Sequence, residues 1–487
     1  MRVCVLAFNS VLSDARILKE ADSLAQAGHD VHVHGLADRK HQGTHLRPSG
    51  ARVTLLVPPK QPPSKSRKLI VPVAGGLALG TAWYVDLFAH FPLLPYVLLA
   101  ASGAVIALGF PKLKVHLVFP FLKGIIAGVL ARSPKWFPVG WMQDIMVRST
   151  HSARIRLLEN AANASGADIV HCHDMYTLPA GAAAAAAMGA QLVWDAHEIY
   201  EEIAQATPQQ QLYYGRLLKR LHGRVDAFIT INDSIAGFYA GRYPALPPSV
   251  IVKNATLPLG SVEDDGRMRR AAQLPETQKI VLYQGGFAEK RGLRDLVAAA
   301  EFLDPDWTLV MMGWGNLEPQ LREIAQGVLG RTVGRQQPAI CFLPPAPHAE
   351  LALWTAGARV GLIPYERAGL NHLFCTPNKL WEYPAAGVPI LCSPLTEMSL
   401  VIARHGVGWL LPEPATPRLI ARTINALTEA ELSAARAACA TYIAQDNWQV
   451  YEARLVRLYQ DLAARRAVPA GTEVPVPATP LSAIPKP

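Results

Sequence analysis

Short apolar runs alternate with helical segments along most of this chain, and that alternation leaves few folds open. It starts with an apolar run at 3–8, a helical segment at 15–26 and a second run at 30–36. This order predicts a parallel, doubly wound α/β sheet. A second series starts near residue 279, after a Pro-rich break at 244–248. The sequence therefore predicts two Rossmann-like domains facing a cleft, where ligands of such folds bind.

A hydrophobic block at 69–131 interrupts the first series. Its runs at 69–85 and 91–110 each approach the ~20 residues that a membrane-spanning helix needs. Lys and Arg flank the pair on both sides, with none between the two runs. Basic flanks of this kind predict a helical hairpin with both ends in the cytoplasm, and the basic, aromatic stretch that follows would lie on the membrane surface. The alternative is a buried or re-entrant hairpin that does not cross.

Size and composition narrow the choice of partners. A chain of 487 residues is long enough for two or three domains. The net charge is +9, but the basic residues form no stripe with interleaved aromatics, so we expect no nucleic-acid partner. Anionic membrane lipid or anionic substrates fit this charge better. Six cysteines without regular spacing indicate a reducing compartment, and the strand-like first residues resemble no cleavable signal peptide.

These patterns define the expected domains. The predicted parts are a first Rossmann-like domain at 1–57 and 142–250, a hydrophobic membrane insertion at 58–141, a second Rossmann-like domain at 251–447, a C-terminal helix at 448–466 and a disordered tail at 467–487. Whether the C-terminal helix returns to the first domain is left open. The tail is rich in Pro, Ala and Thr, a composition that cannot form a core.

The stretch 361–398 carries the strongest candidate site. Pro377 suits the first turn of a helix, and Thr376 before it could cap that helix. Lys379 adds a positive charge in the first turn, beside N–H groups that favour anions. Glu382 lies one turn further on, where its carboxylate could bind a ribose. An ordinary capped helix is the alternative.

Loops after other strands add further candidates. Gly285 and Gly286 would let the backbone approach a ligand, and Arg291 could bind phosphate oxygens with two N–H groups. A plain glycine turn with a solvated Lys-Arg pair is the alternative. The segment His171-Cys-His-Asp174 resembles a metal motif, but its histidines share one strand face while the cysteine points away. We therefore predict no metal site there.

Taken in order, these motifs resemble the GT-B glycosyltransferases of family 4, which are retaining and metal-independent. The matching motifs begin with DARILKEA at 14–21 and continue with HD at 173–174 and DAHE at 195–198. They end with YQGG at 283–286 and with PNKLWEY at 377–383. The resemblance implies a GT-B fold with the hydrophobic hairpin inserted in its first domain. It also implies that the first domain is the acceptor side and that the domain at 251–447 binds the nucleotide-sugar.

The resemblance also implies roles. The implied catalytic residues are His197, Glu198, Arg291 and Lys379, the donor-binding residues are Gly285, Gly286, Arg291, Asn371, Pro377, Asn378, Lys379 and Glu382, and the acceptor-side residues are His173 and Asp174. No cofactor is implied, because the nucleotide-sugar is a substrate. Many relatives carry a second glutamate eight positions before the one at 382, where this chain has Phe374. The sugar end of the site is therefore less well defined than the nucleotide end.

The expected activity is retaining transfer of a sugar from a nucleotide-diphosphate donor, of the hexosyltransferase type (EC 2.4). The acceptor would be a lipid-linked or polysaccharide glycan at the cytoplasmic face of the cell membrane, as in exopolysaccharide assembly. One rival is a GT-B nucleotide-sugar epimerase, which would not need the hydrophobic block. The other is a catalytically silent membrane scaffold of a polysaccharide assembly complex.

Overall fold

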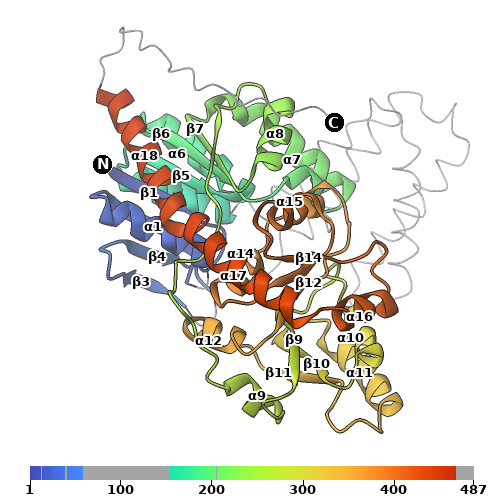
Figure 1. The fold of residues 1–487 in the computed structure, drawn as a ribbon. Coiled ribbons are helices and arrows are strands. Elements are labelled where there is room, and N and C mark those ends of the chain that lie inside the picture. The colour runs from blue at the N-terminus through green and yellow to red at the C-terminus, as the bar shows by residue number, and fades with distance from the viewer. Residues whose placement is uncertain (13, 39–40, 59–152, 204–205, 468–487) are drawn as a thin grey trace, which may run out of the picture. The chain divides into compact units, whose positions relative to one another are not determined.

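The computed structural model describes residues 1–12, 14–38, 41–58, 153–203 and 206–467 (Figure 1). The first half contains a sheet in the order β3-β4-β2-β1-β5-β6-β7-β8. Its strands are β1 (Arg2–Leu6), β2 (Asp30–Leu36), β3 (Gly43–Leu46), β4 (Arg52–Leu56), β5 (Ile169–His173), β6 (Gln191–Ala196), β7 (Ala227–Thr230) and β8 (Ser249–Ile251). Every pairing is parallel except the antiparallel pair of β3 and β4.

Helices connect these strands. They are α1 (Ala15–Gln26), a helical stretch at 153–165, α6 (Asp174–Met188), α7 (Pro208–Leu221) and α8 (Asp233–Arg242), with short 3₁₀ turns at Tyr200–Glu202 and His222–Arg224. Local sequence fixes where they start. Asp14 caps α1 by accepting a hydrogen bond from the N–H of Ile17, and Thr207 forms a capping box with Gln210 at the start of α7.

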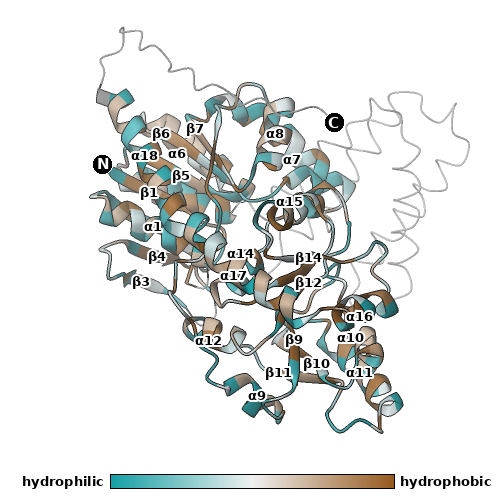
Figure 2. Cartoon of the chain, in the orientation of Figure 1, coloured by the Kyte–Doolittle hydropathy of each residue, from teal (hydrophilic) through white to brown (hydrophobic). Residues whose placement is uncertain are grey.

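The second half contains a fully parallel sheet in the order β11-β10-β9-β12-β13-β14. Its strands are β9 (Lys279–Gly286), β10 (Trp307–Trp314), β11 (Ile340–Leu343), β12 (Val360–Ile363), β13 (Ile390–Cys392) and β14 (Gly408–Leu410). Figure 2 shows that the strands are largely hydrophobic, as expected for sheets covered on both faces. Two doubly wound parallel sheets therefore confirm the predicted α/β architecture.

Ten helices of the described residues belong to this half or follow it. They are α9 (Arg267–Ala272), α10 (Leu293–Ala299), α11 (Glu318–Arg331), α12 (Leu351–Thr355), α13 (Leu370–Leu373), α14 (Lys379–Ala385), α15 (Thr396–His405), α16 (Pro417–Asn425), α17 (Glu429–Gln445) and α18 (Trp448–Ala467), with 3₁₀ turns at Ala300–Phe302 and His348–Glu350. The capping box of Thr428 and Glu431 fixes the start of α17.

The C-terminal helix α18 packs against the first half of the chain (Figure 1). Near its start, the indole N–H of Trp448 donates to Ser23 Oγ of α1 at 3.2 Å. Further along, the Tyr459 hydroxyl lies 2.7 Å from Nδ1 of His171 on β5. Near its end, Arg466 forms an ion pair with Asp168 at 3.3 Å. This helix therefore connects the last part of the chain to the first sheet.

Several elements differ from the sequence-based expectation. The edge strand β3 was not predicted, because Gly-Thr-His-Leu is largely exposed and lacks an apolar face. The short helix α13, the helix α15 and the strand β14 were not predicted either. The expected first-turn position of Pro377 and the expected cap at Thr376 are both wrong, because α14 starts at Lys379 after Asn378, with no side-chain cap.

The predicted membrane segments cannot be compared with this structure. The hairpin at 69–110, the surface stretch after it and the tail at 468–487 lie outside the described residues. Within the ranges that are described, we find no helix with both the length and the apolar character that crossing a bilayer requires.

Candidate active site

Two glycine turns at the carboxyl ends of β9 and β10 lie against each other. Gly285 adopts φ +116°, a conformation that favours glycine, and a Cβ there would meet Lys379 Nζ at 3.0 Å. A Cβ on Gly313 would clash with the carbonyl oxygen of Gly285. The third glycine, Gly315, approaches the backbone of Phe287 equally closely. Glycine is therefore needed here because main chain and the lysine ammonium occupy the space of a side chain.

Two cations lie beside this turn. Lys379 Nζ is 5.3 Å from the ring centroid of Tyr283 and 5.8 Å from that of Tyr365. The guanidinium carbon of Arg291 is 5.3 Å from the same Tyr365 centroid, and its Nη1 donates to the Gly286 carbonyl at 3.2 Å.

The cations are held without anionic partners. Lys379 is only 7% exposed, and within the described ranges neither it nor Arg291 forms an ion pair with a carboxylate. The adjacent Lys290, by contrast, is exposed and pairs with Glu366 at 3.4 Å. Two sheltered positive charges without carboxylates are what an anionic ligand such as a diphosphate requires.

Glu382 lies one turn into α14 and is oriented by a polar chain. Gln284 Nε2 donates to Glu382 Oε2 at 3.0 Å, and the Thr355 hydroxyl donates to Gln284 Oε1 at 2.7 Å. At the start of the same helix, Asn378 Oδ1 accepts from Asn254 Nδ2 at 3.0 Å. The carboxylate of Glu382 is therefore held near the glycine turn, with one oxygen not committed to Gln284.

Asn371 and Phe374 contact the first half of the chain. Asn371 Oδ1 accepts a hydrogen bond from the N–H of Ile199 at 2.9 Å. Asn232 Nδ2 donates to the Phe374 carbonyl at 2.7 Å, and the Phe374 ring packs against the hydrophobic core of the first half. The oxygen of Asn371, predicted as a donor-binding group, is thus engaged between the two halves. Position 374 fills a packing role in place of a carboxylate.

His197 sits between two carboxylates at the end of β6. Its Nε2 is 2.8 Å from Asp195 Oδ2, and its Nδ1 is 3.3 Å from Asp174 Oδ1. Burial opposes the charged form, but these carboxylates raise the pKa of His197 to about 9. Burial alone would raise the pKa of Asp195, yet Arg16 and His197 hold it well below its ordinary value. The arrangement stabilises an imidazolium that is 20% exposed.

Of the other predicted site residues in the first half, Asp174 and Glu198 are accessible to solvent and His173 is buried. Asp174 is partly exposed, adopts φ +64° and accepts a hydrogen bond from the Tyr200 hydroxyl. The ring of His173 is buried and turned toward the interior, so only Asp174 of this pair is accessible. Glu198 is exposed, and its carbonyl accepts from the Tyr239 hydroxyl at 2.7 Å.

Arg16 is a residue that sequence reasoning did not single out. It is buried at the start of α1 and donates to both oxygens of Asp195 at 2.8–3.0 Å. Its Nε also lies 3.0 Å from Glu20, one turn along the helix. A charged pair at spacing four next to the apolar face of a helix was the available signal, because buried charges require partners.

Several polar, aromatic and thiol side chains of the two halves have structural roles. Trp381 and Tyr383 of α14 are fully buried, and the Tyr383 hydroxyl lies within hydrogen-bond distance of three backbone groups. The cysteines are free, and burial raises the pKa of the Cys4 thiol to about 12. His32 and His34 share a strand face, with ring centroids 4.1 Å apart.

Comparison with known proteins gives two family matches. Residues 112–255 match the profile of Glycosyltransferase Family 4, and residues 278–430 match that of Glycosyl transferases group 1. The first match begins inside the range assigned above to a membrane insertion. A curated relative, D-inositol 3-phosphate glycosyltransferase 1 of Catenulispora acidiphila, is 25% identical over 314 residues, which is 60% of this chain and 72% of that protein.

Solved structures share the fold. Sucrose-phosphate synthase from Thermosynechococcus elongatus superposes with a TM-score of 0.63 at 15% identity, covering 96% of this chain and all of that one. Anabaena Alr3699/HepE in complex with UDP-glucose gives a TM-score of 0.54 at 14% identity, covering 96% and 99% of the two chains. WaaG, a glycosyltransferase of lipopolysaccharide biosynthesis, gives 0.55 at 12% identity, covering 94% and 99%.

Proposed function

We propose that this chain, which is a glycosyltransferase with the GT-B fold, moves a sugar from a nucleoside-diphosphate donor to a lipid-linked or polysaccharide acceptor, retaining the anomeric configuration. One observation carries the proposal: Arg291 and Lys379 share the ring of Tyr365 without carboxylate partners in the described residues. A solved neighbour holds UDP-glucose, which supports a donor of this class.

The two cations would act on the leaving group. During transfer, the bond from the anomeric carbon to the diphosphate breaks and a bond to an acceptor hydroxyl oxygen forms, while the hydroxyl proton passes to the leaving phosphate oxygen. Negative charge grows on the diphosphate as it leaves. Arg291 and Lys379 are fixed in place before the reaction, so they stabilise this charge without reorganisation. Rate acceleration of this kind requires cations and hydrogen-bond donors that point at the atoms where negative charge develops.

The remaining polar groups would orient the donor and the acceptor. Glu382, held by Gln284, would accept hydrogen bonds from the ribose hydroxyls. The positive charge of His197, held by Asp195 and Asp174, would lie beside the donor sugar. Glu198 and Asp174 are accessible and would contact the sugar or the acceptor.

Binding of nucleoside diphosphates to single variants tests the anion site. Arg291→Ala and Lys379→Ala should each weaken binding in calorimetric titration by ~1–3 kcal/mol, which is roughly fivefold to 150-fold, because each removes a hydrogen bond to a charged group. Lys290→Ala is the matched control, since that lysine is exposed and paired with Glu366. Unchanged affinity in both site variants would refute the assignment.

A donor panel separates the enzyme from its rivals. Incubation with several nucleotide-sugars and a membrane extract should release free nucleoside diphosphate and give a glycosylated product. A catalytically silent scaffold would bind donor and release nothing. An epimerase would convert the sugar without requiring an acceptor. The same panel identifies the donor base and sugar.

We place the activity at the cytoplasmic face of the cell membrane. The support is the apolar runs at 69–85 and 91–110, the basic residues that flank them and the net charge of +9. The full chain should sediment with membranes and resist extraction by high salt. A variant without residues 60–131 that stays folded and keeps full turnover on a lipid-linked acceptor would contradict this location.

A further inference from the structure

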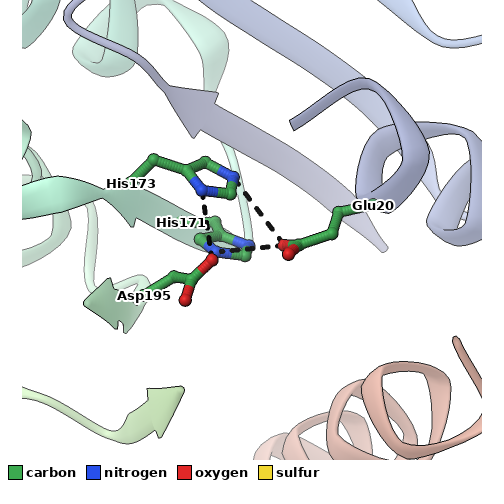
Figure 3. A group of neighbouring side chains, drawn as sticks. All are labelled: Glu20, His171, His173 and Asp195. Carbon is green, nitrogen blue, oxygen red and sulfur yellow. Dashed lines mark ion pairs between the residues drawn. The ribbon is translucent and has the colours of Figure 1, made fainter. Parts of the chain in front are cut away.

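Four side chains converge in the interior of the first half, and one of them, Asp195, contacts His197. Glu20 comes from α1, His171 and His173 come from β5, and Asp195 comes from β6 (Figure 3). In the part of the chain that is described, no other group brings three or more such ligand atoms as close, within 4.8 Å of one another. The sugar-transfer mechanism uses neither Glu20 nor His171.

Three of these atoms lack a hydrogen-bond partner. Glu20 Oε2, His171 Nε2 and His173 Nε2 are buried and make no hydrogen bond in the structure. Glu20 Oε2 lies 3.8 Å from each of the two Nε2 atoms, and the three side chains are at most 2% exposed. Separations of 3.8 Å are too long for direct hydrogen bonds. Leaving such atoms unpaired in the interior is costly.

The same separations suit a shared metal ion. Zinc binds histidine nitrogen and carboxylate oxygen at about 2.0–2.2 Å, so two ligands of one ion lie roughly 3.2–4 Å apart. Two histidines and a carboxylate are a donor set that zinc and related divalent ions accept, with water as a further ligand.

Hydrogen-bond partners at Nδ1 orient both histidine rings so that Nε2 faces Glu20. His173 Nδ1 lies 3.2 Å from Asp195 Oδ2, and an ionised carboxylate can only accept, so Nδ1 carries the proton and Nε2 is left as a ligand. His171 Nδ1 is 2.7 Å from the Tyr459 hydroxyl of α18, whose oxygen can accept a hydrogen bond from Nδ1–H and so leave Nε2 as the ligand atom. Metal-binding histidines have outer partners of this kind.

Arg16 does not block the site. Its Nε lies 3.0 Å from Glu20 Oε1, and its remaining contacts go to Asp195 and to the carbonyl of Val252. Glu20 Oε2 is therefore the oxygen that faces the histidines.

From the sequence, residues 171–174 were expected to hold no metal, because Cys172 points away from the two histidines, but Glu20 of α1 brings a third ligand atom to them. We propose that Glu20, His171 and His173 bind one divalent transition-metal ion, with zinc as the best fit to these donors. Asp195 and Tyr459 hold the two histidines from outside. The ion would tie α1 to β5 and, through Tyr459, to α18, and so stabilise the fold around His197. It is buried in the first half, so it is a structural ion, separate from the cations assigned to the diphosphate.

Metal content of the untagged full-length chain tests the proposal. After loading with zinc and gel filtration, elemental analysis should find about one ion per chain. Stripping with a chelator should lower Tm by several degrees, and added zinc should restore it, because a ligand that binds only the folded state stabilises that state. A water molecule at this position would satisfy the same atoms. In that case the protein would contain no metal and the chelator would not change its Tm. That result would overturn the proposal.

Variants locate the ion. Glu20→Gln and His171→Gln should lose the metal, while His34→Gln should keep it. His34 is the matched control, because it and His32 repeat the His-x-His spacing on β2 without the carboxylate. Metal retained in full by both site variants would overturn the assignment. If neither variant folds, the metal content and chelator response of the unaltered protein decide the question.

Discussion

At the scale of single residues, Asn371 has two possible roles that one pair of variants separates. Its Oδ1 accepts from the N–H of Ile199, a residue that is fully buried. Asn371→Ala should destabilise the protein by ~1–3 kcal/mol in urea titration, because it leaves that N–H without its partner. Asn371→Asp keeps an acceptor oxygen, so its stability and its KM for the donor should stay near those of the unaltered protein.

The outcome also tests the role implied by the family resemblance. If Asn371 binds the nucleotide-sugar through its amide N–H groups, Asn371→Asp removes those N–H groups. The KM for the nucleotide-sugar should then rise as much as it does in Asn371→Ala. Equal losses in the two variants would therefore contradict a role through the oxygen. They would restore the sugar or phosphate contact expected from the sequence.

Site residues were predictable where the signal was local. Lys379 follows a Pro-Asn turn at the start of a helix, and Arg291 follows a glycine turn after a strand, so each pattern lies within a few residues. The bond of Arg16 to Asp195 spans 179 positions, and no local pattern specifies it. The shared ring of Tyr365 was missed for the same reason, because two loops and the start of α14 meet there only in the folded chain.

At the scale of elements, the loop between β9 and α10 depends on Gly292. This residue adopts φ +65° and lies against the carbonyl of Pro364 at the end of β12, where a Cβ would clash. Gly292→Ala should therefore displace the loop that carries Arg291, costing at least ~1–3 kcal/mol of stability from backbone strain and weakening nucleoside-diphosphate binding. Urea titration and calorimetry measure the two effects.

The same substitution elsewhere is the control. Gly330 lies in α11 with no atom near its missing Cβ and without a positive φ. Gly330→Ala should stabilise the protein by ~0.5–1 kcal/mol, because glycine in a helix is entropically costly. If Gly292→Ala behaved like Gly330→Ala, the close approach to Pro364 would not exist in solution.

Element boundaries followed from the sequence where period and caps agreed. The bounds of α1 and β2 match the predicted ones, since Asp14 caps an amphipathic helix that ends before Gly28. The strand β3 has no apolar face, and it exists through its pairing with β4. The four-residue helix α13 likewise forms where Asn371 and Phe374 contact the first half. Tertiary contacts, which local patterns do not encode, decide such short elements.

At the scale of the whole molecule, α18 joins the end of the chain to its beginning. The residues buried on one face of this helix include Tyr451, Leu455, Tyr459 and Leu462. They belong to the same hydrophobic core as Ala21 and Leu24 of α1. The family matches end at residue 430, so this helix lies beyond both matched segments. Its return to the first half was one of the outcomes that the sequence left open.

Substitutions on opposite faces of α18 test this packing. Leu455→Ala should lower the free energy of unfolding by ~2–5 kcal/mol, the range for a buried leucine that leaves a cavity. Arg457→Ala, on the exposed face, should change it by less than about 0.5 kcal/mol. Urea titration should show a lower midpoint with an unchanged slope for Leu455→Ala. Equal midpoints for the two variants would mean that α18 does not pack on α1 in solution, and the contact of Tyr459 with His171 would be lost with it.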